Sequence, residues 1–303
     1  MDIALPTLVL ALALAVFVGI SLGMLGGGGS ILTVPLLVYV LGLPAHEAIA
    51  ASLLVVGTTS VAALVPHARA GRVKWQTGLF FGLASMVGAY SAGRVAKLLP
   101  ATALLLLFGG MMLITAVFMM RGRKTDDKPQ TAVAQSELKR IAFVAGEGLL
   151  VGAFTGLVGA GGGFLVVPAL VLLGGLSMQN AVGTSLLVIA MKSFAGFAGY
   201  LSSTPINWSL AGMVTLAAVV GSFAGAKLAG KVPPDMLRKG FAWFVVVMAV
   251  FILSQEVPKA FGLSFNLAKN WPIELALLAV PVTAAVVSLS RSRPLSPPRP
   301  AAQ

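Results

Sequence analysis

Long apolar runs separated by short polar segments make up most of this sequence. A helix that crosses a bilayer needs about 20 mostly apolar residues, and nine windows reach or approach that length. They lie at residues 5–25, 46–66, 76–93, 101–120, 141–158, 178–200, 207–226, 236–255 and 273–290. Charged residues make up only 10% of the chain, whereas soluble domains carry about 25%. Such a chain cannot hide its apolar surface from water, so the pattern predicts an all-α, polytopic helical membrane protein.

The net charge of +12 does not point to nucleic acid, because of where the basic residues lie. Of 21 lysines and arginines, Lys192 alone lies well inside an apolar run, and the other 20 sit in loops, in tails or at the ends of the runs. Basic loops between apolar runs are typical of cytoplasmic loops that face anionic lipid. The first run, 5–25, has no basic residues before it, and we expect a permanent helix rather than a cleaved signal peptide.

One sequence unit occurs twice, and the repeat shift, defined as the step along the sequence from Gly23 to Gly156, relates the two copies. Gly23–Pro35 aligns without a gap on Gly156–Pro168, and 18 of the 40 positions from Gly23 to Ala62 are identical to their counterparts. The shared register of Gly, Pro and Trp favours a duplication over chance similarity between apolar segments. We therefore divide the chain into a first transmembrane repeat, a cytoplasmic linker, a second repeat with a final helix, and a disordered tail, at 1–120, 121–140, 141–290 and 291–303.

The loop charges bear on how the two copies are oriented. The segment 67–74 holds three basic residues and a histidine, whereas its counterpart 200–207 holds no charge. The positive-inside rule places the first in the cytoplasm and the second outside. Inverted repeats result if each half crosses the membrane an odd number of times. If the short apolar pieces after the glycine clusters are re-entrant, each half crosses four times and the repeats are parallel.

Each copy carries a glycine cluster followed by a run too short to span as a straight helix, 31–41 or 164–173. The clusters predict broken helices, because each glycine inside a helix costs about 1 kcal/mol relative to Ala. A new helix start presents free N–H groups and partial positive charge, which favour an anion. We expect the two breaks to meet near the pseudo-symmetry axis at mid-membrane; close helix packing is the alternative. The candidate substrate-binding residues here are Gly26, Gly27, Gly28, Gly29, Ser30, Gly159, Gly161, Gly162 and Gly163.

Polar residues in the following helices add candidates for the same site. Ser52, Thr184 and Ser185 could donate hydrogen bonds to an anion, although Ser and Thr also bond to their own helix. Asn180 either caps its helix or joins the substrate site. Charges inside a membrane are functional hypotheses by default. Lys192 could bind the anion or neutralise it, with snorkelling of its ammonium toward the membrane surface as the alternative. Glu147 could pair with Lys192 or carry a proton.

The tandem glycine motif, the Gly183-Thr184-Ser185 stretch and the tryptophan-started helices that follow resemble the sulfite exporter TauE/SafE family, also called the toluene sulfonate uptake permease family. The resemblance covers about residues 5–290 and implies a multi-pass carrier of sulfite or organosulfonates in the bacterial inner membrane. The first copy has Ala50-Ala51-Ser52 at the matching positions, so we expect the second half to dominate substrate contact.

The remaining expectations concern chemistry and partners. We expect a secondary transporter working by alternating access, coupled to a proton or ion gradient, because the sequence lacks a nucleotide-binding motif. Homo-oligomers are compatible with it. No metal site or cofactor is expected, since the chain has two distant histidines and no cysteine. An anion channel, a membrane subunit of a complex and an intramembrane enzyme are the alternatives, the last disfavoured by the lack of a clustered catalytic set.

Overall fold

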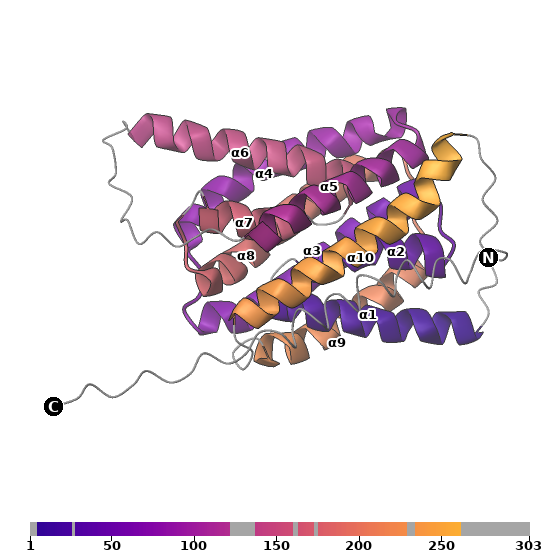
Figure 1. Cartoon of the computed structure of the whole chain (residues 1–303), viewed down its shortest axis with the longest axis horizontal. Helices are drawn as coiled ribbons and strands as arrows, with labels where there is room; N and C mark the ends of the chain where they lie inside the picture. Colours follow the sequence, from indigo (N-terminus) through magenta and orange to yellow (C-terminus); the bar gives the residue numbers. More distant parts are fainter. Residues whose placement is uncertain are drawn as a thin grey trace.

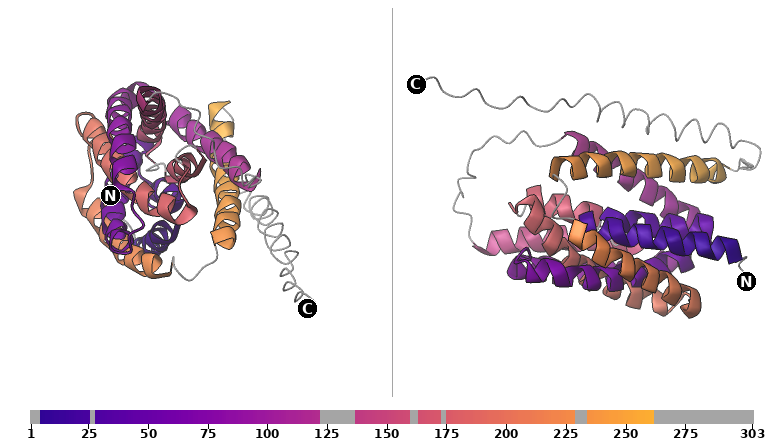
Figure 2. Two further views of the ribbon diagram at one scale, coloured as in Figure 1. Left: turned by 90° about the vertical axis from the view of Figure 1, so that its left-hand side faces the viewer. Right: turned by 90° about the horizontal axis from the view of Figure 1, so that it is seen from below.

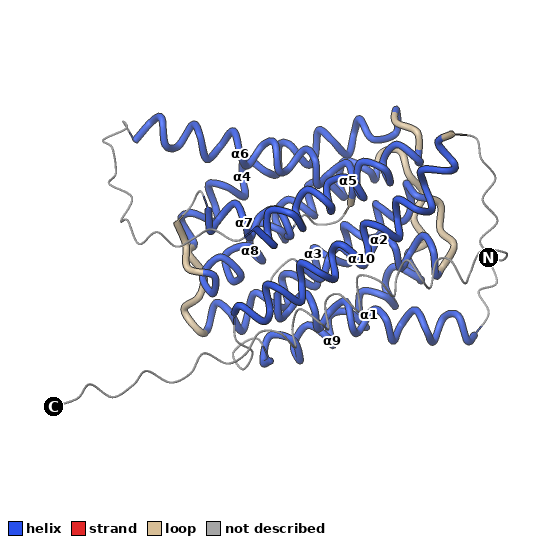
Figure 3. Tube along the Cα trace, viewed as in Figure 1, coloured by secondary structure: helices blue, strands red, loops and turns tan. Residues whose placement is uncertain are grey.

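The protein is seen here in a computed structural model that describes residues 5–25, 28–121, 137–159, 163–172, 175–228 and 234–261. All regular structure within these ranges is helical (Figure 3). In chain order the elements are α1 (Leu5–Leu25), the 3₁₀-helix η1 (Gly28–Leu32), α2 (Thr33–Pro35), the π-helix η2 (Leu36–Val40), α3 (Ala45–Arg69), α4 (Trp75–Val95), the 3₁₀-helix η3 (Ala96–Leu98), α5 (Ala101–Arg121), α6 (Glu137–Val158), α7 (Gly163–Leu172), α8 (Met178–Leu201), α9 (Trp208–Leu228) and α10 (Pro234–Ala260).

The predicted membrane helices are confirmed over the described part of the chain. Eight of the nine predicted windows coincide with α1, α3, α4, α5, α6, α8, α9 and α10. Five of these helices are long and apolar enough to cross a bilayer over their described residues. The ninth window, 273–290, and the predicted tail, 291–303, lie outside the described residues. At the predicted linker, α5 ends at Arg121 and α6 already begins at Glu137.

The long helices lie side by side along the long axis of the molecule (Figure 1). Their packing forms a series in the order α1, α9, α3, α8, α4, α6, in which each helix contacts the next. The repeat shift exchanges α1 with α6, α9 with α4, and α3 with α8. The series therefore reads the same from either end, with α3 and α8 at its centre. The remaining long pair, α5 and α10, packs together beside the bundle (Figure 2).

Glycine contacts between the helices obey the same repeat shift. A side chain on Gly19 of α1 would collide with the carbonyl oxygen of Ala218 in α9. At the positions equivalent to Gly19 and Ala218 in the other copy, a side chain on Gly152 of α6 would collide with the carbonyl oxygen of Ser85 in α4. Backbones approach this closely only where glycine stands, which is the usual role of small residues between membrane helices. The repetition supports the predicted duplication.

The two short segments also end in the same way. After the first, Gly42 has φ +69° and the Leu43 N–H donates to the Leu37 carbonyl at 3.0 Å. After the second, Gly175 has φ +64° and the Leu176 N–H donates to the Leu170 carbonyl at 3.1 Å. In both, a left-handed glycine follows the helix, and the N–H of the next residue donates to the carbonyl six positions earlier in the chain. Equivalent residues therefore perform equivalent local tasks in the two copies.

The ends of α3 show how the two copies are oriented. At the start of α3, Glu47 Oε1 accepts from the Asn207 N–H at 3.0 Å, so this end of α3 lies beside the loop 202–207. At the far end of α3, the His67 Nε2 lies 3.2 Å from the Gly23 carbonyl oxygen. Because α3 is a single helix of 25 residues, the loops 70–74 and 202–207 lie at opposite ends of the bundle. We infer inverted repeats, as the loop charges favoured.

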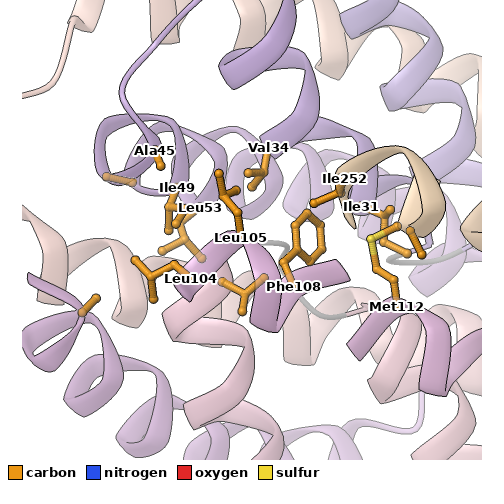
Figure 4. Close-up of a cluster of buried hydrophobic side chains, with 14 of the residues drawn as sticks. Ile31, Val34, Ala45, Ile49, Leu53, Leu104, Leu105, Phe108, Met112 and Ile252 are labelled. Atoms are coloured by element: carbon orange, nitrogen blue, oxygen red, sulfur yellow. The ribbon is translucent and has the colours of Figure 1, made fainter. Parts of the chain in front are cut away.

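A large apolar cluster fills the space between the first short segment, α3, α5 and α10 (Figure 4). Ile31 and Val34 enter it from the short segment, and Phe108 and Met112 from α5, all fully buried. Together with Ile252 of α10, these side chains attach the α5–α10 pair to the bundle. Their packing fixes the position of the first short segment in the bundle, and with it the position of the backbone groups near the first glycine cluster.

Candidate functional site

The first glycine cluster is followed by a short segment of mixed helix type. Gly26 and Gly27 lie outside the described residues, while Gly28, Gly29 and Ser30 belong to η1. One turn of α-helix, α2, and one of π-helix, η2, complete the segment. The break and the short helix after it were predicted correctly, while the mixture of 3₁₀-, α- and π-turns was not specified by the sequence. Pro35 lacks the N–H that would continue the α-helical ladder, and a π-turn follows directly, a feature frequent at functional sites.

The second cluster gives a more regular break. Gly159 ends α6 with φ +71°, a conformation that side-chain-bearing residues rarely adopt. Gly161 and Gly162 lie outside the described residues, and Gly163 is the first residue of α7. At 10 residues, this helix is too short to span, as expected.

The two short segments meet inside the bundle. η1, the first turn of one segment, packs against α7, the short helix of the other half. From there they diverge: Figure 1 shows α2 and α7 toward opposite ends of the bundle. The arrangement agrees with the expected pair of broken helices near the pseudo-symmetry axis.

The three hydroxyls chosen from the sequence are all buried, and all are engaged within the protein. Ser52 Oγ donates to the Gly159 carbonyl at 2.6 Å and so holds the second break against α3. Thr184 Oγ1 accepts from the Lys74 N–H at 2.9 Å, which ties α8 to the start of α4. Ser185 Oγ donates to the Val182 carbonyl of its own helix at 2.8 Å. These contacts are structural, and each would have to be given up for the hydroxyl to serve a ligand.

Asn180 is not the helix cap that one interpretation assigned to it. The N-cap of α8 is Ser177, whose Oγ accepts from the Asn180 N–H at 3.4 Å. Asn180 is half-buried in the first turn of α8. Its side chain stands about 18 Å along the helix from Lys192, at about 1.5 Å per residue, so the two cannot contact one small ligand.

At Lys192 the structure adds the most to what the sequence predicted. It is 1% exposed and lies well inside α8, about 21 Å along the helix from its first residue. Its Nζ has no hydrogen-bond partner among the described residues. The side chain therefore does not reach the surface of the protein, which removes the snorkelling explanation. The predicted pair of Glu147 with Lys192 is not formed, because Lys192 Nζ has no hydrogen-bond partner among the described residues. The residue after Glu147, Gly148, packs against the Phe81 carbonyl of α4.

Other buried polar atoms without a partner in the described part of the chain were missed by the sequence reasoning. They are Thr33 Oγ1, Ser60 Oγ, His67 Nδ1 and Ser193 Oγ. A signal was present for two of them, because the repeat shift takes Ser60 to Ser193. Such groups are rare in native structures and call for an explanation at each position.

A buried carboxylate was also missed. Glu256 of α10 is 1% exposed, accepts from the Tyr39 hydroxyl at 3.1 Å, and pairs with Lys259 Nζ at 2.7 Å. The Tyr39 ring packs edge-on against Phe251 at 5.2 Å between centroids. This cluster fastens η2 to α10. Glu256 escaped notice because it stands one residue beyond the apolar window 236–255.

Two surface grooves run beside the short segments and are lined almost wholly by apolar side chains. One lies between α1, η2 and α10, and the other between α5, α6 and α7. Grooves of this composition suit acyl chains and offer an anion no donors. The buried polar groups of α3 and α8 offer the donors that these two grooves lack.

Comparisons with known proteins place this architecture among membrane transporters. A sequence model of the family described as "Sulfite exporter TauE/SafE" matches residues 11–252. The chain is 34% identical over 239 residues to a "Probable membrane transporter protein" of Xylella fastidiosa, covering 78% of this chain and 91% of the relative. It is 27% identical over 235 residues to "Probable membrane transporter protein YdhB" of Bacillus subtilis, covering 78% and 96%. A similarly named protein of Methanocaldococcus jannaschii is 27% identical over 263 residues, covering 80% and 96%. No solved structure matches.

Proposed function

The chain belongs to the sulfite exporter TauE/SafE family and is a membrane transporter, and from that premise we propose that it carries a small sulfur oxyanion, sulfite or an organosulfonate, by alternating access. The cell membrane is its location, since the described chain is a multi-pass helical bundle. Coupling to a proton or ion gradient belongs to the proposal, because the sequence offers no nucleotide-binding motif.

One observation carries the choice of an anion: the ammonium group of Lys192 is buried without a partner among the described residues. A charge taken out of water is strongly unfavourable unless an opposite charge and hydrogen bonds compensate it. In membrane proteins such groups mark ion and substrate paths. A small anion that enters the bundle and binds Lys192 supplies the missing charge.

The broken helices support the same conclusion. The start of a helix presents backbone N–H groups without intrahelical partners and partial positive charge, and α7 packs against η1 of the other short segment. The glycines of both clusters leave the backbone open to close approach by a ligand. In this proposal Gly26–Ser30 and Gly159–Gly163 contact the anion, while Ser52 positions the second break through the Gly159 carbonyl.

The inverted arrangement explains how one site is served from both sides. Helices α3 and α8 exchange under the repeat shift and contact each other at the centre of the bundle. Rocking of one half against the other opens the centre first to one face and then to the other, without moving the site. Sulfite and sulfonate headgroups are compact anions that such a centre can hold.

The test is flux by the purified full-length protein in liposomes. Sulfite, sulfoacetate, toluenesulfonate and sulfate are compared with and without a pH gradient, above neutral pH so that neutral sulfur dioxide does not leak. We expect saturable uptake of sulfite or a sulfonate, and exchange of labelled against unlabelled substrate. Absence of flux for every anion, under either condition, would overturn the proposal; flux that fails to saturate indicates a channel instead.

A further inference from the structure

We propose that Ser60 of α3 and Ser193 of α8 complete the anion site with Lys192, by donating hydrogen bonds to the oxygens of one ligand at the crossing of the two helices. The inference rests on the proposed transport of a small oxyanion and says where that anion is held. Neither serine was among the hydroxyls expected from the sequence. Ser193 is the chain neighbour of Lys192, and Ser60 is its counterpart in the other copy.

Both serines project into the contact between α3 and α8. Val56 and Ala63 of α3 pack in one buried cluster with Leu186 and Ile189 of α8. Ser60 stands four positions after Val56 and three before Ala63, so it lies on the same helix face. Ser193 follows Ile189 by four positions and continues the facing stripe of α8.

The depth of the two serines is that of the bundle centre. A Cβ atom added to Gly57, the middle residue of α3, would lie 3.4 Å from the Ser193 Cβ. Ser60 is one turn further along α3, and Ser193 is within about one turn of the middle of α8. Lys192 precedes Ser193 directly and follows Ile189 of the same cluster by three positions. All three polar side chains are therefore buried at the depth of the contact between α3 and α8.

The hydroxyls are free to serve a ligand. Both serines are 0% exposed, and neither Oγ has a hydrogen-bond partner among the described residues. Buried hydroxyls in helices ordinarily donate to a carbonyl of the preceding turn, as Thr59 Oγ1 does to Val55 at 2.6 Å and Ser85 Oγ to Phe81 at 2.8 Å. Besides Thr33 of the first short segment, Ser60 and Ser193 carry the buried hydroxyls that have no partner in the described residues, and Ser193 is next to the unpartnered lysine. A shared ligand accounts for Ser60, Ser193 and Lys192 together.

The two copies contribute differently to the proposed site. Ser60 and Ser193 are exchanged by the repeat shift, so a ligand on the pseudo-twofold axis receives one hydroxyl from each half. Lys192 is exchanged with Thr59, which is uncharged and engaged in its own helix. The site is symmetric in its hydroxyls and asymmetric in its charge. Each half therefore keeps a contact with the ligand while the halves rock, and the ammonium of one half opposes the negative charge of the anion.

The number of donors indicates the chemical class of the ligand. One ammonium and two hydroxyls offer donors from three directions. Sulfite and the sulfonate headgroup each present three acceptor oxygens on one sulfur atom. Sulfate adds a fourth oxygen, which would need a further donor in a buried setting. The geometry therefore favours the three-oxygen anions over sulfate.

The experiment measures sulfite binding to the purified full-length protein by calorimetry, and liposome flux alongside it. We compare Ser60→Ala and Ser193→Ala with the matched control Ser85→Ala, which removes an equally buried hydroxyl engaged in its own helix. A hydrogen bond to a charged ligand predicts that either test variant binds sulfite about tenfold to 100-fold more weakly. The control is expected to bind like the wild type, and the thermal stability of all three is expected to remain near that of the wild type.

The outcomes separate the two proposals. Wild-type flux with unchanged sulfite affinity in both alanine variants overturns the assignment of Ser60 and Ser193 and leaves the transport function standing. Lack of any oxyanion flux by the wild type overturns the proposed function itself. If an alanine variant does not fold, the cysteine variants, which keep the shape but donate weakly, are measured instead, with the same loss of affinity expected and unchanged affinity again contradicting the assignment.

Discussion

Replacing Lys192 by methionine changes binding and stability in opposite directions if the lysine holds an anion. Methionine has nearly the length of the lysine stem and no charge, so the packing inside α8 is largely kept. In the protein without substrate, the substitution removes an ammonium group that is 1% exposed and has no hydrogen-bond partner in the described residues. With substrate present, it removes the charge that opposes the anion.

The magnitudes follow from that environment. Truncating one partner of a buried, hydrogen-bonded charge pair weakens binding by about 2–5 kcal/mol, which is roughly 30-fold to several thousandfold in affinity. Replacing buried charged groups by apolar ones of similar volume is often neutral or stabilising, by about 1–4 kcal/mol. We therefore expect Lys192→Met to lose sulfite binding while its unfolding temperature without substrate stays level or rises.

The assay is thermal unfolding of the detergent-purified protein with and without sulfite, together with flux in liposomes. The wild type is expected to be stabilised by substrate, because a ligand that binds only the folded state raises the unfolding temperature; Lys192→Met is expected to lose that shift. Lys192→Arg keeps the charge and serves as the comparison. A variant that loses stability yet binds sulfite as tightly as the wild type would refute the reasoning and make the lysine structural.

Three further predictions test the scaffold around the site. Gly159→Ala is expected to destabilise the protein by about 2 kcal/mol or more, because φ is +71° and the new Cβ would lie 2.8 Å from a backbone atom of the facing helix. The control is Gly212→Ala, whose new Cβ would have no atom within 4 Å. Equal shifts of the unfolding temperature in the two variants would contradict this prediction. Ser52→Ala is expected to cost about 1–3 kcal/mol of stability by leaving a carbonyl without its donor, and a loss of sulfite affinity without a loss of stability would assign Ser52 to the ligand. In this cysteine-free chain, Ala70→Cys is expected to be shielded from a membrane-impermeant thiol reagent added outside cells and Ser203→Cys to react; labelling of both or of neither would refute the inverted topology.

Much of the architecture was predictable because it depends on long-range regularities in the sequence. Spanning helices follow from windows of about 20 apolar residues, and the duplication follows from a fixed register of glycine, proline and tryptophan. The contrast between a basic loop and its uncharged counterpart favoured the inverted orientation that we infer from the ends of α3. The broken helices followed from the glycine clusters. Each of these signals extends over many residues, so an exception at one position does not remove it.

The details of the site were not predictable in the same way, because they depend on which atoms meet. The sequence could not reveal that Ser52 is engaged by Gly159, or that Thr184 accepts from the Lys74 backbone. Those pairings join residues that are far apart in the chain. In the sequence, Ser60 and Ser193 look the same as serines whose hydroxyls bond to a carbonyl of their own helix. Only the three-dimensional structure shows that these two hydroxyls make no such bond.

Two local details have simple physical origins. Asn180 was considered as a cap because asparagine caps helices well, but Ser177, three positions earlier, takes that position with extended backbone, ψ 151°. The first short segment is helical as expected, but Pro35 lacks an N–H for the α-helical ladder and the chain continues as a π-turn. Helix propensities show which residue types can cap or interrupt a helix, and packing decides which of several neighbouring positions does so.

The most direct test of an anion held between α3 and α8 is to locate one. Selenite is the selenium analogue of sulfite and gives an anomalous X-ray signal, so crystals of the full-length protein grown with selenite report its position. The account predicts a peak within hydrogen-bonding reach of Lys192 Nζ and of the Ser60 and Ser193 hydroxyls, absent from crystals of Lys192→Met. A peak found only at the basic loop 70–74, or one that persists unchanged in the variant, would contradict it.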